Sequence, residues 1–138
     1  MNGDKNRIRV YVSHPIRGVK GKNATKEDME ANNRLATIFG KALSKEFPDV
    51  EFYVPATHDE FVLIGYEEGI LSEEQILFID CKIIDTCQVV LVYIPKRHIS
   101  NGMFTEVDHT NMTGKQTLLV NDDNAIRIFR RYLKGLMT

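Results

Sequence analysis

Apolar residues along this chain fall into two kinds of pattern, short continuous runs and longer stretches with helical spacing. The short runs hold four to six residues and are rich in β-branched and aromatic side chains, a pattern typical of buried strands. They lie at residues 8–12, 50–54, 89–94 and 117–120. The run at 89–94, VVLVYI, is the clearest of these predicted strands.

Apolar residues spaced three and four apart occupy most of the segments between the runs, and they predict helices. The predicted helices extend from near Thr25 to Pro48, from Ser72 to about Thr86, from about Met103 to Met112, and onward from Asp123. Ser72 and Gln75 form a capping box, which supports the second helix. Residues 55–71 are interrupted by Gly65 and Gly69, and their pattern predicts no definite element.

The alternation of strands and helices predicts the fold class. Strands that are apolar on both faces are typical of parallel sheets covered by helices on both sides. We therefore predict an α/β fold of three layers, Rossmann-like or flavodoxin-like, with a mainly parallel sheet of four or five strands. The chain has 138 residues with no repeat or linker, so residues 1–138 are expected to form a single domain.

The predicted topology places a ligand site between two loops. In open α/β sheets, ligands bind at the carboxyl ends of strands where the strand order reverses. If the first and third strands are neighbours, as in a 2-1-3-4 order, the loops SHPIRGVKG (13–21) and PKRHISNG (95–102) meet there. These are also the loops richest in glycine, serine and basic residues.

Several residues of these loops suit an anion. Arg17 offers a planar fork of donors, and Gly18 permits close approach of the backbone. Ser100, Asn101 and Gly102 precede or open a predicted helix, whose N-terminal N–H groups attract negative charge. Taken alone, Arg17 fits an ordinary surface arginine equally well.

Two carboxyls and a tyrosine are the candidates for chemistry. Glu106 lies one turn into the third predicted helix, where it is either a nucleophile or base facing the crevice, or a solvated residue favoured by the helix dipole. Asp80 stands in a strongly apolar helical segment, and burial there would raise its pKa. Tyr11 ends a core strand, and its hydroxyl would need a partner if buried.

Composition narrows the class of protein. Lys and Arg number 18 against 19 Asp and Glu, for a net charge of -1, so a dedicated nucleic-acid binder is not expected. No apolar run is long enough to cross a membrane. Two cysteines form no disulfide framework, and four scattered histidines have no metal-ligand spacing. We expect a cytoplasmic protein that binds a small molecule and holds no metal.

Three motifs, in this order, carry a resemblance to a known family. They resemble the nucleoside 2-deoxyribosyltransferase superfamily, most closely its 2'-deoxynucleoside 5'-phosphate N-hydrolase branch. The motifs are Tyr11-x-x-x-x-Ile16-Arg17-Gly18 after the first strand, Asp80, and Ser100-x-Gly102-x-x-x-Glu106 after the third strand. The chain departs from the family pattern at His14 and Pro15, where a Gly-Ser pair is usual.

The resemblance implies an enzyme that cleaves the N-glycosidic bond of a (deoxy)nucleoside 5'-monophosphate through a covalent glycosyl-glutamate. Glu106 would be the nucleophile, Asp80 would protonate or orient the leaving base, and Tyr11 would orient Glu106. Arg17, Ser100 and the neighbouring backbone would bind the phosphate, with no cofactor. A homodimer or larger homo-oligomer is implied. The alternatives are base exchange on unphosphorylated deoxynucleosides, or a non-catalytic nucleotide-binding or sensor domain.

Overall fold

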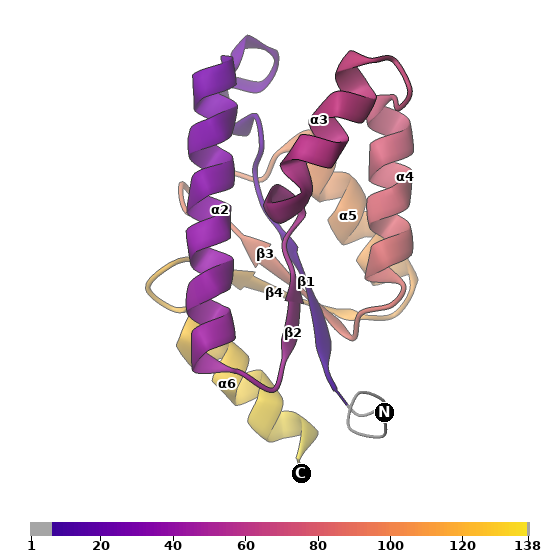
Figure 1. The fold of residues 1–138 in the computed structure, drawn as a ribbon. Helices are drawn as coiled ribbons and strands as arrows, with labels where there is room; N and C mark the ends of the chain where they lie inside the picture. The colour runs from indigo at the N-terminus through magenta and orange to yellow at the C-terminus, as the bar shows by residue number, and fades with distance from the viewer. Residues whose placement is uncertain (1–6, 138) are drawn as a thin grey trace.

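The computed structural model describes residues 7–137, and within them four parallel strands form one sheet. The strands are β1 (Arg9–Ser13), β2 (Glu51–Tyr53), β3 (Val89–Tyr93) and β4 (Gln116–Val120). Their order is β2-β1-β3-β4, so β1 and β3 are neighbours at the centre (Figure 1). Both the predicted α/β fold and the predicted strand order are confirmed.

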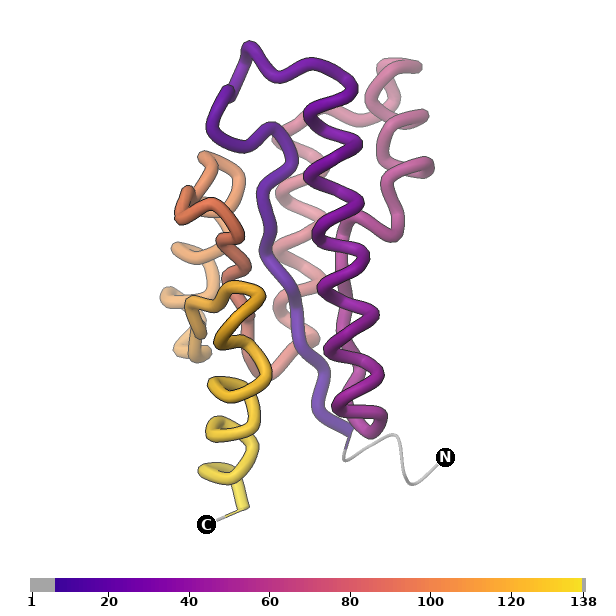
Figure 2. Tube along the Cα trace, turned by 90° about the vertical axis from the view of Figure 1, so that its left-hand side faces the viewer, coloured from indigo at the N-terminus to yellow at the C-terminus, as the bar shows by residue number. Residues whose placement is uncertain are grey.

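Helices cover both faces of this sheet. They are α2 (Lys26–Glu46), α3 (Asp59–Glu67), α4 (Glu73–Ile84), α5 (Asn101–Met112) and α6 (Ala125–Leu136), with the short 3-10 helices η1 (Gly18–Asn23) and η2 (Pro55–His58). Figure 2 shows α2 and α6 on the near side of the sheet, with α3 and α4 on the far side. The helices α4 and α5 pack against each other.

The alternation of side chains along β1 separates two cores. Val10 and Val12 point to one face and pack with residues of α2 and α6, including Phe39 and Phe129. Tyr11 points to the other face, where it packs with buried apolar residues of α4 and α5. Because successive strand residues alternate, Ser13 shares the face of Tyr11, and this face carries the candidate site.

Side-chain caps fix where three of the helices begin. Thr25 and Asp28 form a reciprocal capping box at α2, and Ser72 and Gln75 form the predicted one at α4. Ser100 caps α5 by accepting from the N–H of Met103 at 3.4 Å. That cap extends α5 to Asn101, two residues earlier than the apolar spacing predicted.

The segment that the sequence left unassigned, residues 55–71, contains η2 and α3. Gly65 is needed inside α3, since a Cβ there would lie 2.7 Å from Leu71 Cδ1. Gly69 follows the helix with a φ of +71°, a left-handed conformation that favours glycine. The two glycines that obscured the helical pattern therefore serve its packing and its termination.

The longest helix, α2, has 21 residues and buries only one stripe, formed by Ala36, Phe39, Gly40 and Leu43. Gly40 sits against β2, where a Cβ would lie 2.6 Å from Val54 Cγ2. Over residues 7–137, no helix combines the length and the apolar character needed to cross a bilayer.

The aromatic core beneath α6 gives a direct test of the fold. Phe129 is fully buried, with ring centroids 5.0 Å from Phe47 and 5.5 Å from Phe52. Phe129→Ala should lower the free energy of unfolding by about 3–5 kcal/mol, because it leaves a cavity. The matched control is Phe104→Ala, since Phe104 is 52% exposed. Urea denaturation measures both, and equal losses would contradict the assignment of this core.

Candidate functional site

The carboxyl group of Glu106 is the centre of the candidate site. Glu106 lies on α5 and is only 5% exposed. The hydroxyl of Tyr11 donates to its Oε2, and the hydroxyl of Ser13 donates to its Oε1 at 2.7 Å. Both donors come from β1 and are themselves fully buried. Both oxygens of Glu106 are thus held by hydroxyl groups of one strand.

Local structure explains why these groups meet. Tyr11 and Ser13 are two residues apart on a strand, so both face α5. The N-cap at Ser100 sets the start of α5 and hence the direction in which Glu106 points. At Gly102 a Cβ would lie 3.5 Å from Leu77 Cδ2, an ordinary contact, so the packing of α4 on α5 does not require glycine there.

Asp80 on α4 lies close enough to Glu106 to alter its protonation. Burial and the nearby Asp80 carboxyl raise the pKa of Glu106 to about 8. Burial also raises the pKa of Asp80 to about 6, with hydrogen bonding to Glu106 and Tyr11 acting against that rise. Two carboxyls that close titrate as a pair, and near neutral pH the pair holds one proton.

Hydrogen bonding bears on where that proton resides. Both Glu106 oxygens already accept from hydroxyls, and hydrogen bonds to the charged form favour that form. A proton on Glu106 would compete with one of these donors. Burial and the two carboxyls also raise the pKa of Tyr11 well above its ordinary value, so its phenol remains a donor. The hydroxyl donors thus favour an ionised Glu106, whereas burial raises its pKa above that of Asp80, so the two carboxyls share one proton.

The first loop brings Ile16, Arg17 and Gly18 together at the carboxyl end of β1. The carbonyl of Ile16 accepts from Asn32 Nδ2 at 2.8 Å, which ties the loop to α2. Gly18 has a φ of +70°, and a Cβ there would lie 2.9 Å from the same Asn32 nitrogen. Arg17 is exposed and forms an ion pair with Glu73 at the start of α4.

A small hollow joins this loop to the loop after β3. Its volume is about 80 Å³. The basic residues at its lining come from both loops, and they are Arg17, Lys20, Lys96 and His98. The two loops therefore meet at the point of the sheet where the strand order reverses, as the topology predicted.

The other predicted binding residues lie at the start of α5. Ser100 Oγ accepts from Met103 N–H, which leaves the serine's own hydrogen available to donate. Asn101 is exposed at the first position of the helix, and its carbonyl accepts from Thr105 Oγ1 at 3.3 Å. Gly102 is the second residue of α5, next to Asn101.

The sequence reasoning missed two buried polar residues, Ser13 and His14. The signal for Ser13 was its place two residues after Tyr11, on the same face of the strand. His14 Nε2 accepts from the N–H of Ala56 at 3.1 Å, and its Nδ1 is 3.2 Å from the carbonyl of Pro15. Burial lowers the pKa of His14 to about 4, so it is a neutral, structural link between the first loop and η2.

Metal ligation has no support within the described residues. No group of three or more His, Cys, Asp or Glu side chains in residues 7–137 is placed to hold a metal ion.

Comparisons with protein-family models, with curated proteins and with solved structures find no match to this chain. The function must therefore be argued from the chemistry of the site.

The buried carboxyl pair makes a prediction about stability and pH. The folded state raises the pKa of Glu106 from 4.5 to about 8, so the pair of Glu106 and Asp80 keeps a proton that the unfolded chain releases. The free energy of unfolding should therefore fall as the pH rises through that interval. In Glu106→Gln the side chain cannot ionise, and the fall should be much smaller.

Urea denaturation at about pH 5 and about pH 8 measures this effect. The quantity compared is the change in the free energy of unfolding between the two pH values. A loss of stability in Glu106→Gln that is the same at both pH values, as from altered hydrogen bonding, does not affect that change. Asp108→Asn, at an exposed position on the same helix, should keep the wild-type slope. Equal slopes for wild type and Glu106→Gln would contradict the assignment of a raised pKa to this carboxyl.

Proposed function

We propose that this protein cleaves the N-glycosidic bond of a (deoxy)nucleoside 5'-monophosphate through a covalent bond between the sugar and Glu106. The observation that carries the proposal is a buried Glu106 whose two oxygens accept from hydroxyls and which shares one proton with Asp80. In the reactive form of the proposed enzyme Glu106 is ionised and Asp80 holds the shared proton. Cleavage of this bond develops positive charge on the sugar and negative charge on the base. A carboxylate stabilises the positive charge on the sugar, and a carboxylic acid protonates the departing base, as in retaining glycosidases.

In the first step, an oxygen of Glu106 attacks C1' of the sugar. The bond between C1' and the base nitrogen breaks, and its electron pair leaves with the base. Asp80 supplies the proton that neutralises the departing base, as a general acid. Tyr11 and Ser13 are positioning residues in this scheme, because they orient the carboxylate through its two oxygens.

In the second step, water attacks C1' and the ester bond to Glu106 breaks, which restores the carboxylate. Asp80, now ionised, takes the proton of that water and returns to its starting state. The roles of the two carboxyls thus alternate between the steps, as the retaining mechanism requires. If a second base replaced water as the acceptor, the same groups would perform base exchange.

The cations around the first loop support a phosphorylated substrate. Arg17, Lys20 and Lys96 line the hollow between the two loops, and guanidinium and ammonium groups there attract a phosphate. Backbone N–H groups at the start of α5 add to this attraction. In the free protein Arg17 is paired with Glu73, so phosphate binding would replace one anionic partner with another.

The resemblance to the nucleoside 2-deoxyribosyltransferase superfamily is part of the same proposal, as is a cytoplasmic homodimer or larger homo-oligomer. Phe61 on α3 is 75% exposed, Ile70 is 69% exposed, and Phe78 on α4 is 63% exposed. A second copy that covered these side chains would remove apolar area from water. Phe78 lies two residues from Asp80, so such a contact would adjoin the site.

Turnover of a substrate panel tests the proposed reaction. We expect nucleoside 5'-monophosphates to release free base without an added acceptor, as followed by chromatography. Glu106→Gln should lower kcat by about 10³-fold or more, as removal of a nucleophile does. Asp80→Asn should lower it by about 10²-fold or more, because the general acid is lost. Asp108→Asn, outside the site, should match the wild type.

The other outcomes separate the alternatives. Base exchange only with an acceptor base would assign a transferase. Binding without turnover would assign a non-catalytic nucleotide-binding domain. A Glu106→Gln variant as active as the wild type would eliminate the covalent mechanism.

The pairing of Arg17 with Glu73 gives a separate prediction about the phosphate. Arg17→Gln should raise KM for monophosphates by about tenfold or more, the scale of one charge-assisted contact. The matching free nucleosides should be affected little. Glu73→Gln should lower KM for monophosphates, because it releases Arg17 from its ion pair. Equal effects of Arg17→Gln on both substrate classes would contradict a phosphate role for Arg17.

A further inference from the structure

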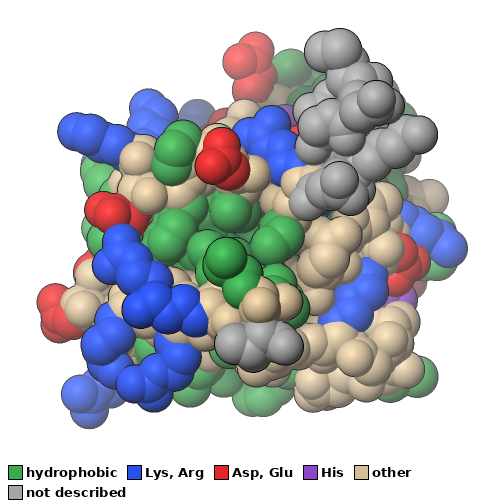
Figure 3. All heavy atoms as spheres, turned by 90° about the horizontal axis from the view of Figure 1, so that it is seen from below, with side chains coloured by type: hydrophobic (Ala, Val, Ile, Leu, Met, Phe, Trp, Pro, Cys, Tyr) green, Lys and Arg blue, Asp and Glu red, His purple; other side chains and the backbone are tan. Residues whose placement is uncertain are grey.

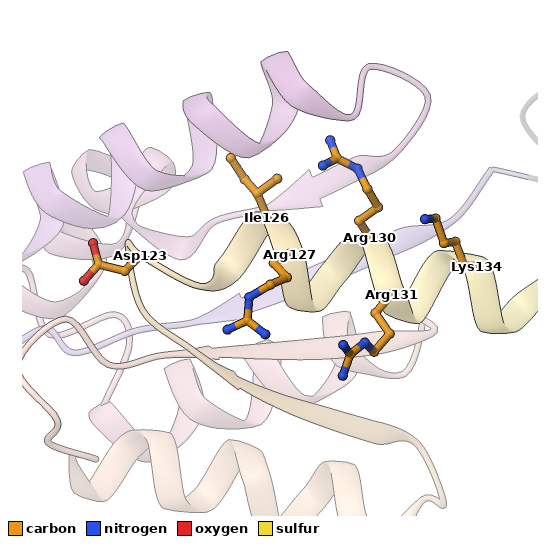
Figure 4. Close-up of a pocket in the computed structure, with 6 residues that line it drawn as sticks. All are labelled: Asp123, Ile126, Arg127, Arg130, Arg131 and Lys134. Carbon is orange, nitrogen blue, oxygen red and sulfur yellow. The ribbon is translucent and has the colours of Figure 1, made fainter.

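A stripe of basic residues runs along α6, on the opposite face of the sheet from Glu106. The four cations at positions 127, 130, 131 and 134 have helical spacings of three and four, so they share one side of the helix. They line a hollow of about 430 Å³, together with Asp123 and Ile126 (Figure 4). Figure 4 shows Arg127 and Arg131 extending in the same direction from the helix.

The apolar side of α6 is already occupied by the fold. Ala125 and Phe129 are buried in the core against the sheet, and Leu133 packs beside them. The basic side therefore faces outward, and Ile126, which is 36% exposed, is the apolar residue of α6 that lines the hollow beside the cations. Figure 3 views the molecule from below, where α6 ends, and Lys and Arg side chains gather along one side of that view.

Three of the four cations are free to take an external anion. Arg130 is paired with Glu46 at 2.7 Å and lies over the ring of Phe47, so it anchors α6 to α2. Within residues 7–137, Arg127, Arg131 and Lys134 have no carboxylate at ion-pair distance. Asp123 also lines the hollow and opposes an anion.

We propose that this hollow binds an oligophosphate, a chain of about three phosphate groups that is either free or part of a nucleoside triphosphate. Arginine forks match phosphate oxygens in geometry as well as in charge. From residue 127 to 134 the helix rises about 10 Å, which a single phosphate cannot span and a short phosphate chain can. The volume of the hollow lies in the range of small-ligand sites.

The charge of the remaining surface favours a short anion over a nucleic acid. The chain has a net charge of -1, so removal of the four positive charges of the stripe leaves a net charge of -5 elsewhere. An extended polyanion would meet that negative surface beyond α6, whereas an oligophosphate would be confined to the hollow. Nucleic-acid binders usually contact more phosphates than three free cations can neutralise.

Isothermal titration at low salt, with inorganic tripolyphosphate, ATP, AMP and phosphate as ligands, tests the proposal. We expect tripolyphosphate and ATP to bind at least about tenfold more tightly than phosphate or AMP, with affinity that falls as salt increases. Equal affinities for tripolyphosphate and ATP would identify a free phosphate chain as the ligand. Tighter binding of ATP would identify the nucleoside triphosphate.

The matched variants remove two charges at the same helical spacing. The double variant Arg127→Gln and Arg131→Gln should weaken tripolyphosphate binding about tenfold or more, as expected for two lost ion pairs. The control is Lys41→Gln and Lys45→Gln, at exposed positions on α2. Asp123→Asn should tighten binding.

Two results would overturn the proposal. The first is an equal loss in the arginine and lysine double variants, which would show only a general charge effect. The second is a short single-stranded RNA that binds more tightly than tripolyphosphate and depends on the two arginines. Glu106 lies on the other face, so base-release activity should be the same in wild type and in the arginine variant.

Discussion

The burial of two carboxyl groups on one face of a parallel sheet is the constraint on which the candidate site depends. An uncompensated carboxylate inside a protein is costly, and Glu106 is only 5% exposed. The structure offsets this cost with two hydroxyl donors from β1 and with a proton shared with Asp80. Each solution requires a particular residue type, since a strand of only apolar side chains could not keep Glu106 ionised.

The topology brings these groups together from distant parts of the chain. Tyr11 and Glu106 are 95 residues apart in sequence, and they meet because β1 and β3 are neighbours at the centre of the sheet. The same arrangement sets the loops after β1 and β3 side by side, so their cations surround one hollow. The hollow is bounded by both loops and by α2, and the acid pair lies on the α4 and α5 side of the sheet.

Much of this could be predicted from the sequence, for reasons that can be stated. The strands and the capping box at Ser72 depend on neighbours within a few residues, and the structure confirms them. The pairing of Tyr11 with Glu106 came from a resemblance between ordered motifs, and the structure shows the contact. In contrast, the buried role of His14 depends on Ala56, and the partner of Arg17 is Glu73. No local pattern encodes such distant partners.

The net charge of the chain conceals an uneven distribution. Its value of -1 suggests a surface with little electrostatic character, yet cations gather in two places, at the loops after β1 and β3 and along α6. Those at the loops line one hollow at the carboxyl end of β1, where they attract an anion. Those on α6 lie on a helix whose apolar side already stabilises the core. Core packing requires nothing of Arg127, Arg131 or Lys134, and none of the three has a carboxylate at ion-pair distance within residues 7–137, so they remain available to an anion from outside the fold.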